Sequence, residues 1–510
     1  MLPVLIREGT SGIVEVKGFG APQTWHPDND LDKALDLLFT LYEARTPDGV
    51  RFQDNYHHEG FNWLSTQVGN LYWRWLFRIV QYGALLEDLA GRGRVPYFLN
   101  RLNFARVWEV LHPRRPGPWA GLEAWRLYRR ALPAHNRQVA ARPGGDLLFY
   151  RYGPRDFRTR EMLDVFEAEG APFHFVYSPS RPLFARRHAQ GRPVYFLHRR
   201  WAAPRIFCNS YDLSGFPGGL RPAVAAIIRR AEEHMSFAVW EYHQHLEALR
   251  PRPPRLLFGL EDHQEIYPLL YACRTLGVPT VGYQFSMYAR RQAAYTLERW
   301  APGSYDGFDN VITWGPYWEQ VLRRWSQVYP EGYHLPGANK LSYGYRRLES
   351  ERFSTRNILI PYEFWGNTRR IGQCMQKLMD RGWTVYFKFK PDEEPDRQLD
   401  CYELPGAYRE RVVEVRDITD ELMAEINVVA GGMTTLLYDL LPYGKHTWVF
   451  ETEFRLLDDM VQDGLAEKIR CEDLDTLPDP GPADRQVDRA WLFNPAPLPE
   501  VLRTHVLARL

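Results

Sequence analysis

The stretch from Asn427 to Glu451 is the feature that most constrains the fold of this chain. Its short apolar run NVVA is typical of a buried strand, and the apolar spacing from Met433 to Tyr443 is that of a helix. A second apolar run, HTWVF, is again typical of a strand. Because parallel strands need a crossover connection of about this length, the stretch predicts one βαβ unit of a parallel sheet.

Strand-like and helix-like patterns alternate from Asp146 onward. The first series has strand-like runs at 147–153, 172–178, 255–262 and 278–286, and 193–197 and 205–209 are further candidates. The second has runs at 310–315, 357–364, 383–391, 412–417, 427–430 and 446–450, and a helix is expected at 454–469. Two such series predict an α/β fold in which two Rossmann-like, doubly wound parallel sheets face a cleft.

The first 145 residues precede this alternation and mostly show helical spacing. Residues 1–24 are expected to form a small hairpin or arm. Trp73 and Trp75 make one helix face very apolar, which predicts packing within its own domain, with a helix that docks on a partner or membrane as the alternative. With ARPGG at 141–145 as the linker, the predicted domains are 1–145, 146–308 and 309–510, and the last helix is expected to pack back across the molecule.

Composition excludes several classes of protein. A hydrophobic content of 45% and a charged content of 25% are those of a soluble globular protein, and a net charge of +1 creates no global field for nucleic acid or a membrane. The five cysteines are scattered without a CxxC pair, so no disulfide framework or zinc site of that type is indicated. Without a leader or a long apolar run, we expect a cytoplasmic protein, with peripheral association at the inner membrane as an option.

Histidines cluster in the segment HMSFAVWEYHQH, which contains His234, Glu241, His243 and His245. The spacing matches no metal-binding helix motif, because His243 and His245 do not share a helix face and no His-Glu-x-x-His is present. We therefore expect a structural role for these side chains and no metal site.

Four short motifs follow one another in a fixed order. They are GLEDHQEIYPLLYACRTLGVPTVGYQFS at 259–286, NVITWGPYWEQVLRRW with YHLPGANK at 310–340, VYFKFKPDEEPD at 385–396, and the βαβ unit with its Tyr-Gly-Lys at 443–445. With these motifs, the chain from about Asp146 to its end resembles GT-B glycosyltransferases of bacterial surface polysaccharide synthesis. The most similar branch includes capsule and lipopolysaccharide transferases such as Kdo and sialic-acid transferases.

Two departures from the family pattern are visible. Phe285 stands where the family has the histidine of Gln-His-Gly or Gln-His-Ser. In the third motif, where the family usually has Lys-x-His-Pro, Asp392 follows Pro391 and no histidine is present.

The resemblance implies an acceptor domain at 146–308 and a donor domain at 309–510. It points to Glu261 as the base that takes the acceptor proton, with His263 as an alternative base and Asp262 as a second acid or a helix cap. The turn of the βαβ unit, at the positive end of a helix dipole, is the candidate phosphate site, or else only a helix cap. Its residues are Gly431, Gly432, Thr434 and Thr435.

Other polar residues are expected at strand ends around the same cleft. Lys388 and Lys390 alternate along one strand and share a face, so they are candidates to neutralise a phosphate or a sugar carboxylate, or else form a solvated edge. The remaining candidates are Gln284 and Ser286 for the cleft wall, Tyr362 and Glu363 for the donor, and Glu451 for ribose hydroxyls.

The sequence thus favours a glycosyltransferase with a nucleotide-activated donor, a CMP-sugar such as CMP-Kdo in the first place, and a glycan or lipid-linked glycan acceptor. It implies no cofactor besides this co-substrate, no metal and no nucleic-acid partner. One alternative is a CDP-polyol phosphotransferase of the teichoic-acid type. A second is an inactive GT-B scaffold in a polysaccharide assembly complex, which the two missing family histidines keep open.

Overall fold

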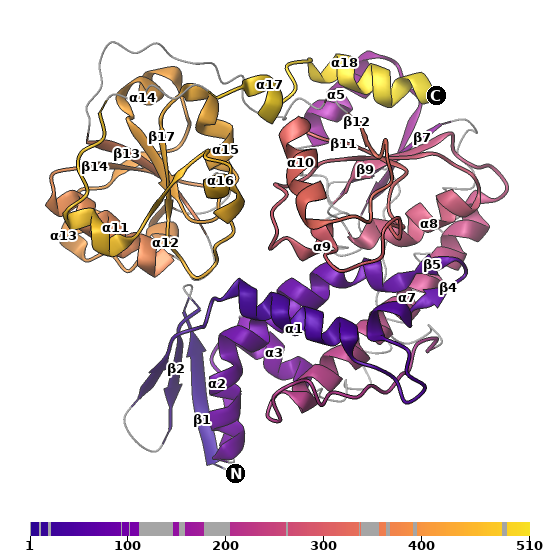
Figure 1. Cartoon of the computed structure of the whole chain (residues 1–510), viewed down its shortest axis with the longest axis horizontal. Helices are drawn as coiled ribbons and strands as arrows, with labels where there is room; N and C mark the ends of the chain where they lie inside the picture. Colours follow the sequence, from indigo (N-terminus) through magenta and orange to yellow (C-terminus); the bar gives the residue numbers. More distant parts are fainter. Residues whose placement is uncertain are drawn as a thin grey trace.

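The computed structural model of the chain is shown in Figure 1. It describes residues 2–9, 12–18, 22–92, 94–100, 103–111, 146–151, 159–177, 205–261, 264–335, 337, 356–363, 368–390, 395–481 and 487–510. The described part comprises an N-terminal region and two parallel six-stranded sheets with helices on both. The predicted linker at 141–145 and the candidate strand at 193–197 lie outside the described residues.

The N-terminal region combines helices with a four-stranded sheet of order β3-β2-β1-β6. Its strands are β1 (Leu2–Glu8), β2 (Val14–Lys17), β3 (Gln23–Trp25) and β6 (Arg94–Phe98). Its main helices are α1 (Leu31–Glu43), α2 (Phe77–Gly91) and α3 (Asn103–Leu111). The parallel pairing of β1 with β6 extends the hairpin expected at 1–24 into a sheet, and it joins segments that are distant in sequence.

The apolar segment before α2 is a π-helix, η3 (Asn70–Leu76), rather than regular α-helix. Trp73 and Trp75 are partly buried and pack against the main hydrophobic core. The indole nitrogen of Trp73 also donates to Oε1 of Gln292 at 3.2 Å. This face is therefore used in internal packing, as the first of the two sequence interpretations expected.

The first Rossmann-like sheet has the order β12-β11-β10-β9-β7-β8, and all its pairs are parallel. Its strands are β7 (Leu147–Arg151), β8 (Phe173–Tyr177), β9 (Leu256–Leu260), β10 (Thr280–Tyr283), β11 (Asn310–Ile312) and β12 (His334–Leu335). The domain boundary predicted at 308/309 is wrong, because β11 and β12 hydrogen-bond into this sheet. Residues 205–209 contain no strand.

Helices flank the first sheet in the alternation that the sequence predicted. They are α5 (Arg160–Ala168), α7 (Arg221–Leu249), α8 (Tyr267–Thr275) and α10 (Pro316–Trp325). The longest helix, α7, lies against α8 and also against α3 of the N-terminal region. The N-terminal region therefore shares the core of the first domain.

The second sheet has the order β15-β14-β13-β16-β17-β18 and is also parallel throughout. Its strands are β13 (Asn357–Pro361), β14 (Thr384–Lys388), β15 (Val413–Val415), β16 (Val428–Gly431), β17 (His446–Phe450) and β18 (Glu467–Ile469). The two-sheet α/β architecture predicted from the sequence is confirmed. The helix expected at 454–469 is wrong in part, since only α16 (Asp458–Gln462) is helical there and β18 follows it.

The C-terminal segment returns to the first domain after α17 (Arg489–Leu492) (Figure 1). The indole nitrogen of Trp318 donates to the carbonyl of Leu492 at 2.8 Å. Farther on, α18 (Leu498–His505) lies against α5, and Arg503 pairs with Glu169 at 2.7 Å. The chain end therefore ties the two Rossmann-like domains together from the side away from the N-terminal region.

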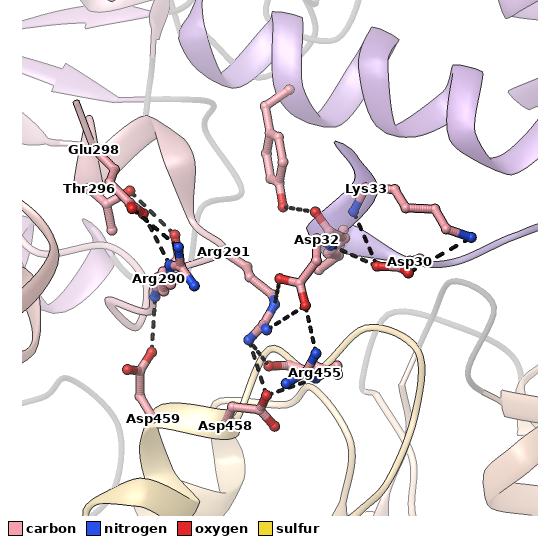
Figure 2. Close-up of polar contacts among 12 residues, drawn as sticks. Asp30, Asp32, Lys33, Arg290, Arg291, Thr296, Glu298, Arg455, Asp458 and Asp459 are labelled. Carbon is pink, nitrogen blue, oxygen red and sulfur yellow. Dashed lines mark hydrogen bonds and ion pairs between the residues drawn. The ribbon is translucent and has the colours of Figure 1, made fainter. Parts of the chain in front are cut away.

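A charged network joins the N-terminal region to both sheets (Figure 2). Arg291, in the segment after β10, contacts both carboxylate oxygens of Asp32 at 2.7 and 2.8 Å. Its third nitrogen donates to the carbonyl of Arg455 at 2.7 Å and reaches Asp458 at 3.3 Å, both in the segment after β17. The backbone N–H of Arg290 donates to Asp459 at 2.9 Å. The segments at the carboxyl ends of the two sheets therefore meet here.

This network predicts a specific loss of stability. Arg291 is only 7% exposed, so Asp32→Ala would leave a buried guanidinium without its bidentate partner. We expect the free energy of unfolding to fall by about 3 kcal/mol. Urea unfolding measures it, with Asp36→Ala, an exposed acid of the same helix, as the control. Equal effects of the two substitutions would contradict a structural role for the network.

Candidate functional site

The predicted site residues follow the strands of both sheets at their carboxyl ends. Because all strands of a parallel sheet point the same way, residues that follow different strands come together at one edge, where ligands of open α/β sheets bind. On the first sheet these residues are Glu261 after β9 and Gln284 and Ser286 after β10. On the second sheet they are Tyr362 and Glu363 after β13, Lys388 and Lys390 at the end of β14, Gly431 to Thr435 at the end of β16, and Glu451 after β17.

Glu261 occupies the tip of the central strand β9. Its backbone N–H donates to the carbonyl of Tyr283 at 3.2 Å, which continues the ladder between β9 and β10. The side chain is half-buried, and its Oε1 atom is buried. The two other predicted catalytic residues, Asp262 and His263, lie outside the described residues.

Four buried tyrosines are close enough to Glu261 for its charge to affect their pKa values, and no sequence motif predicted them. Burial raises the pKa of Tyr288 and of Tyr329 well above its usual value, and the negative charge of Glu261 is the second cause for both. Tyr305 and Tyr333 belong to the same group, and the hydroxyl of Tyr333 donates to that of Tyr305 at 2.9 Å. These phenols stay neutral at any ordinary pH, so the Glu261 carboxylate lies near uncharged hydroxyl groups. The four tyrosines are spread over residues 288–333 without a motif.

Gln284 has a structural role, which corrects its assignment to the substrate. Its side chain is buried, its Oε1 accepts from the backbone N–H of Trp314 at 2.8 Å, and its Nε2 donates to the carbonyl of Ser286 at 2.9 Å. The indole nitrogen of Trp314 donates to the Gln284 carbonyl at 3.0 Å. Gln284 therefore holds the ends of β10 and β11 together. Ser286, two residues on, remains half-buried at the edge.

The glycine turn after β16 holds a carboxylate of the chain itself. Oε1 of Glu363 accepts hydrogen bonds from the backbone N–H groups of Gly432, Met433 and Thr434 at 2.7, 2.8 and 3.1 Å. These are amides that the sequence interpretation assigned to a donor phosphate. With the amides already bonded and Glu363 fully buried, both the phosphate role of this turn and the donor contact of Glu363 are corrected. Glu363 braces the turn from β13.

The glycines of this turn are required by the same carboxylate. A Cβ atom at Gly431 would lie 2.6 Å from Oε1 of Glu363 and 3.0 Å from Leu437. The helix that follows, α15 (Leu436–Leu440), is shorter than predicted and continues as a 3-10 turn to Tyr443. The hydroxyl of Thr434 accepts from the N–H of Leu436 at 3.2 Å, which ties the turn to the first residue of this helix.

The remaining donor-side candidates differ in their exposure to solvent. Lys388 is half-buried, donates to the carbonyl of Phe389 at 2.6 Å, and has its pKa lowered by burial. Lys390 is exposed, and its backbone is held by Gln398. Glu451 pairs with Lys468 at 3.2 Å. Tyr362 is partly buried, so Lys390 is the exposed member of this set and the other three are partly buried.

Comparison with known proteins gives a distant likeness in fold. No family model matches the chain, and no curated protein is similar to it in sequence. Among solved structures, it is similar to MurG from Acinetobacter baumannii (12% identity, TM-score 0.38, 65% of this chain and 89% of that chain). It is also similar to CalG4, the calicheamicin glycosyltransferase (14%, 0.39, 65% and 87%), and to a putative UDP-N-acetylglucosamine 2-epimerase from Listeria monocytogenes (11%, 0.36, 65% and 86%).

Glu363 makes a prediction about pH. Burial raises its pKa to about 7 in the folded chain, although the three amides lower it. A raised carboxyl pKa means that the folded state binds more protons, so stability is lost as the pH rises from about 4.5 through 7. Glu363→Gln keeps an acceptor oxygen and removes this loss. We expect the stability of the variant relative to the parent to increase by on the order of 3 kcal/mol between pH 5 and 8.

Urea unfolding at pH 5, 6, 7 and 8 measures this difference. Glu414→Gln, an exposed glutamate of the same domain, serves as the control and should run parallel to the parent. A constant offset between Glu363→Gln and the parent at all four pH values would show that Glu363 does not titrate in this range.

Proposed function

We propose that this chain is a glycosyltransferase that moves a sugar from a nucleotide-activated donor to a glycan acceptor. The observation that supports the proposal is the meeting of two parallel sheets at their carboxyl ends, joined by the contacts of Arg290 and Arg291 with the segment 455–459. Each sheet brings its own polar groups to this junction. A reaction between two bound substrates needs such an arrangement, since each must be held before the transfer.

The two edges are suited to different substrates. Glu261, at the tip of β9, is the group we assign as general base, because an acceptor hydroxyl must lose a proton as the new bond forms. The donor lies over the second edge in this proposal, against Tyr362, Lys390, Thr435 and Glu451. Because the turn amides bind Glu363, the charge of the donor phosphate is assigned to Lys390, with Lys388 beside it.

The finer assignment is also a proposal. The resemblance of the four sequence motifs favours a CMP-sugar such as CMP-Kdo as donor and a glycan or lipid-linked glycan of a surface polysaccharide as acceptor. None of the described helices combines the length and apolarity needed to cross a bilayer. Peripheral association at the inner face of a membrane is part of the same proposal.

Donor binding tests the proposal most directly. We expect one class among CMP-, UDP- and GDP-sugars to bind to the purified chain in isothermal titration calorimetry, with the CMP-sugar strongest. Lys390→Ala should weaken that binding, because the phosphate charge then lacks its exposed cation. A folded chain that binds none of these donors would overturn the proposal.

Catalysis gives a separate prediction. Glu261→Gln should lower the rate of transfer by about 10²- to 10⁴-fold, because the amide cannot take the acceptor proton, and it should leave donor affinity unchanged. Glu265→Gln, in the turn that follows, is the matched control and should stay within a few fold of the parent. Equal rates for Glu261→Gln and the parent would remove Glu261 from the chemistry.

A further inference from the structure

A second cluster of functional side chains lies outside the junction of the sheets. His58 and Glu59 belong to the tight hairpin of β4 (His57–His58) and β5 (Phe61–Asn62), and His243 belongs to α7. One nitrogen of each imidazole and one oxygen of Glu59 all lie within 4.8 Å of one another. Two neutral imidazoles and a carboxylate are ligands that zinc and related divalent ions prefer.

The distances in this cluster are close to those of a metal site. With metal–ligand bonds of about 2.0–2.2 Å and tetrahedral angles, neighbouring ligand atoms are about 3.3–3.5 Å apart. Nε2 of His243 lies 3.3 Å from Oε1 of Glu59, and Nε2 of His58 lies 3.7 Å from the same oxygen. The two imidazole nitrogens lie within 4.8 Å of each other, so binding an ion requires the two histidines to approach by at most about 1.5 Å.

Aromatic neighbours fix the orientation of both imidazoles. The ring of His58 meets Phe207 edge-on with centroids 6.3 Å apart, and the ring of His243 packs against Tyr242 at 5.0 Å. The three ligand side chains are between 35% and 44% exposed. An ion can therefore enter from solvent, and water can occupy the coordination position that the protein leaves open.

The backbone places Glu59 where a glutamate is uncommon. Glu59 and Gly60 have φ values of 52° and 84°, the left-handed conformation of a two-residue hairpin turn, in which asparagine and glycine are preferred. A side chain other than glycine or asparagine costs about 1 kcal/mol there. The turn directs the Glu59 carboxylate to His243, so the less favourable residue contributes the shared ligand of the cluster.

We propose that His58, Glu59 and His243 bind one divalent transition-metal ion, zinc by ligand chemistry, which links the β4–β5 hairpin to α7. The ion replaces the two contacts of Glu59 with His58 and His243 by three coordinate bonds. Helix spacing alone suggested no metal site, because His243 finds its fellow ligands about 185 residues earlier in the chain, on a hairpin rather than on its own helix.

Zinc titration of the full chain tests the site. The protein, freed of any affinity tag and stripped with EDTA, is titrated with zinc against a chromophoric chelator. We expect one zinc ion per chain, bound at least about 10-fold more tightly than by His58→Ala or His243→Ala. The matched control is His57→Ala, which removes the exposed neighbouring histidine outside the cluster. Cys208→Ser removes the exposed thiol and should also keep the site.

Glu59→Gly separates metal binding from folding. It removes a ligand and relieves the left-handed backbone, so the metal-free melting temperature should equal or exceed that of the parent. Zinc should raise the melting temperature of the parent and not that of Glu59→Gly. The proposal is overturned if the parent takes up no stoichiometric zinc, or if His57→Ala weakens zinc binding as much as His243→Ala does.

Discussion

The ion pair between Arg291 and Asp32 is the contact on which the arrangement of the three regions depends. The guanidinium, 7% exposed, lies between α1, the segment after β10 and the segment after β17. Its planar donors fix direction as well as distance, which an ammonium group could not do. Removing such a charge from water costs several kcal/mol, so the gain is in geometry more than in net stability. The orientation of one carboxyl edge to the other is set here, where Asp458 and the Arg455 carbonyl complete the contacts.

The turn after β16 has the local structure that the sequence predicted, but its amides bind a side chain of the same protein instead of the expected phosphate. Gly431 and Gly432 do follow a buried strand and open a helix, as the sequence predicted. Free amides at such a turn require an acceptor, and a phosphate is the usual one. Here Glu363 supplies it from β13, about 70 residues earlier, and no local feature identifies that pairing. The turn amides are therefore bonded within the chain, and Lys390 at the end of β14 is the exposed cation of this edge among the candidate residues.

The difference between local patterns and contacts of distant segments also explains which parts of the fold were predictable. Most strands of both sheets could be located, because they are buried apolar runs with turn residues at their ends. The exception is β18, a mostly exposed strand that lies in the stretch 454–469 expected to be helical. The pairing of the strands could not be predicted equally well. The strands β11 and β12 belong to the first sheet although they lie beyond the expected boundary at 309, and β1 pairs with β6. The tyrosines around Glu261 and the histidine pair His58 and His243 were missed for the same reason. Contacts between distant segments leave no periodic signal in the chain.

The two carboxyl edges differ in charge, and the difference fits the proposed division of substrates. In the part of the first edge that the structure describes, the carboxylate of Glu261 lies among phenols that burial keeps neutral. A negatively charged donor is repelled from it, whereas a neutral acceptor hydroxyl is attracted as a hydrogen-bond donor. On the second edge, the turn amides already bind Glu363, and Lys390 is exposed to solvent. In the proposed reaction the donor is therefore favoured on the second edge and the acceptor on the first, and the contacts of Arg291 hold the two edges next to each other.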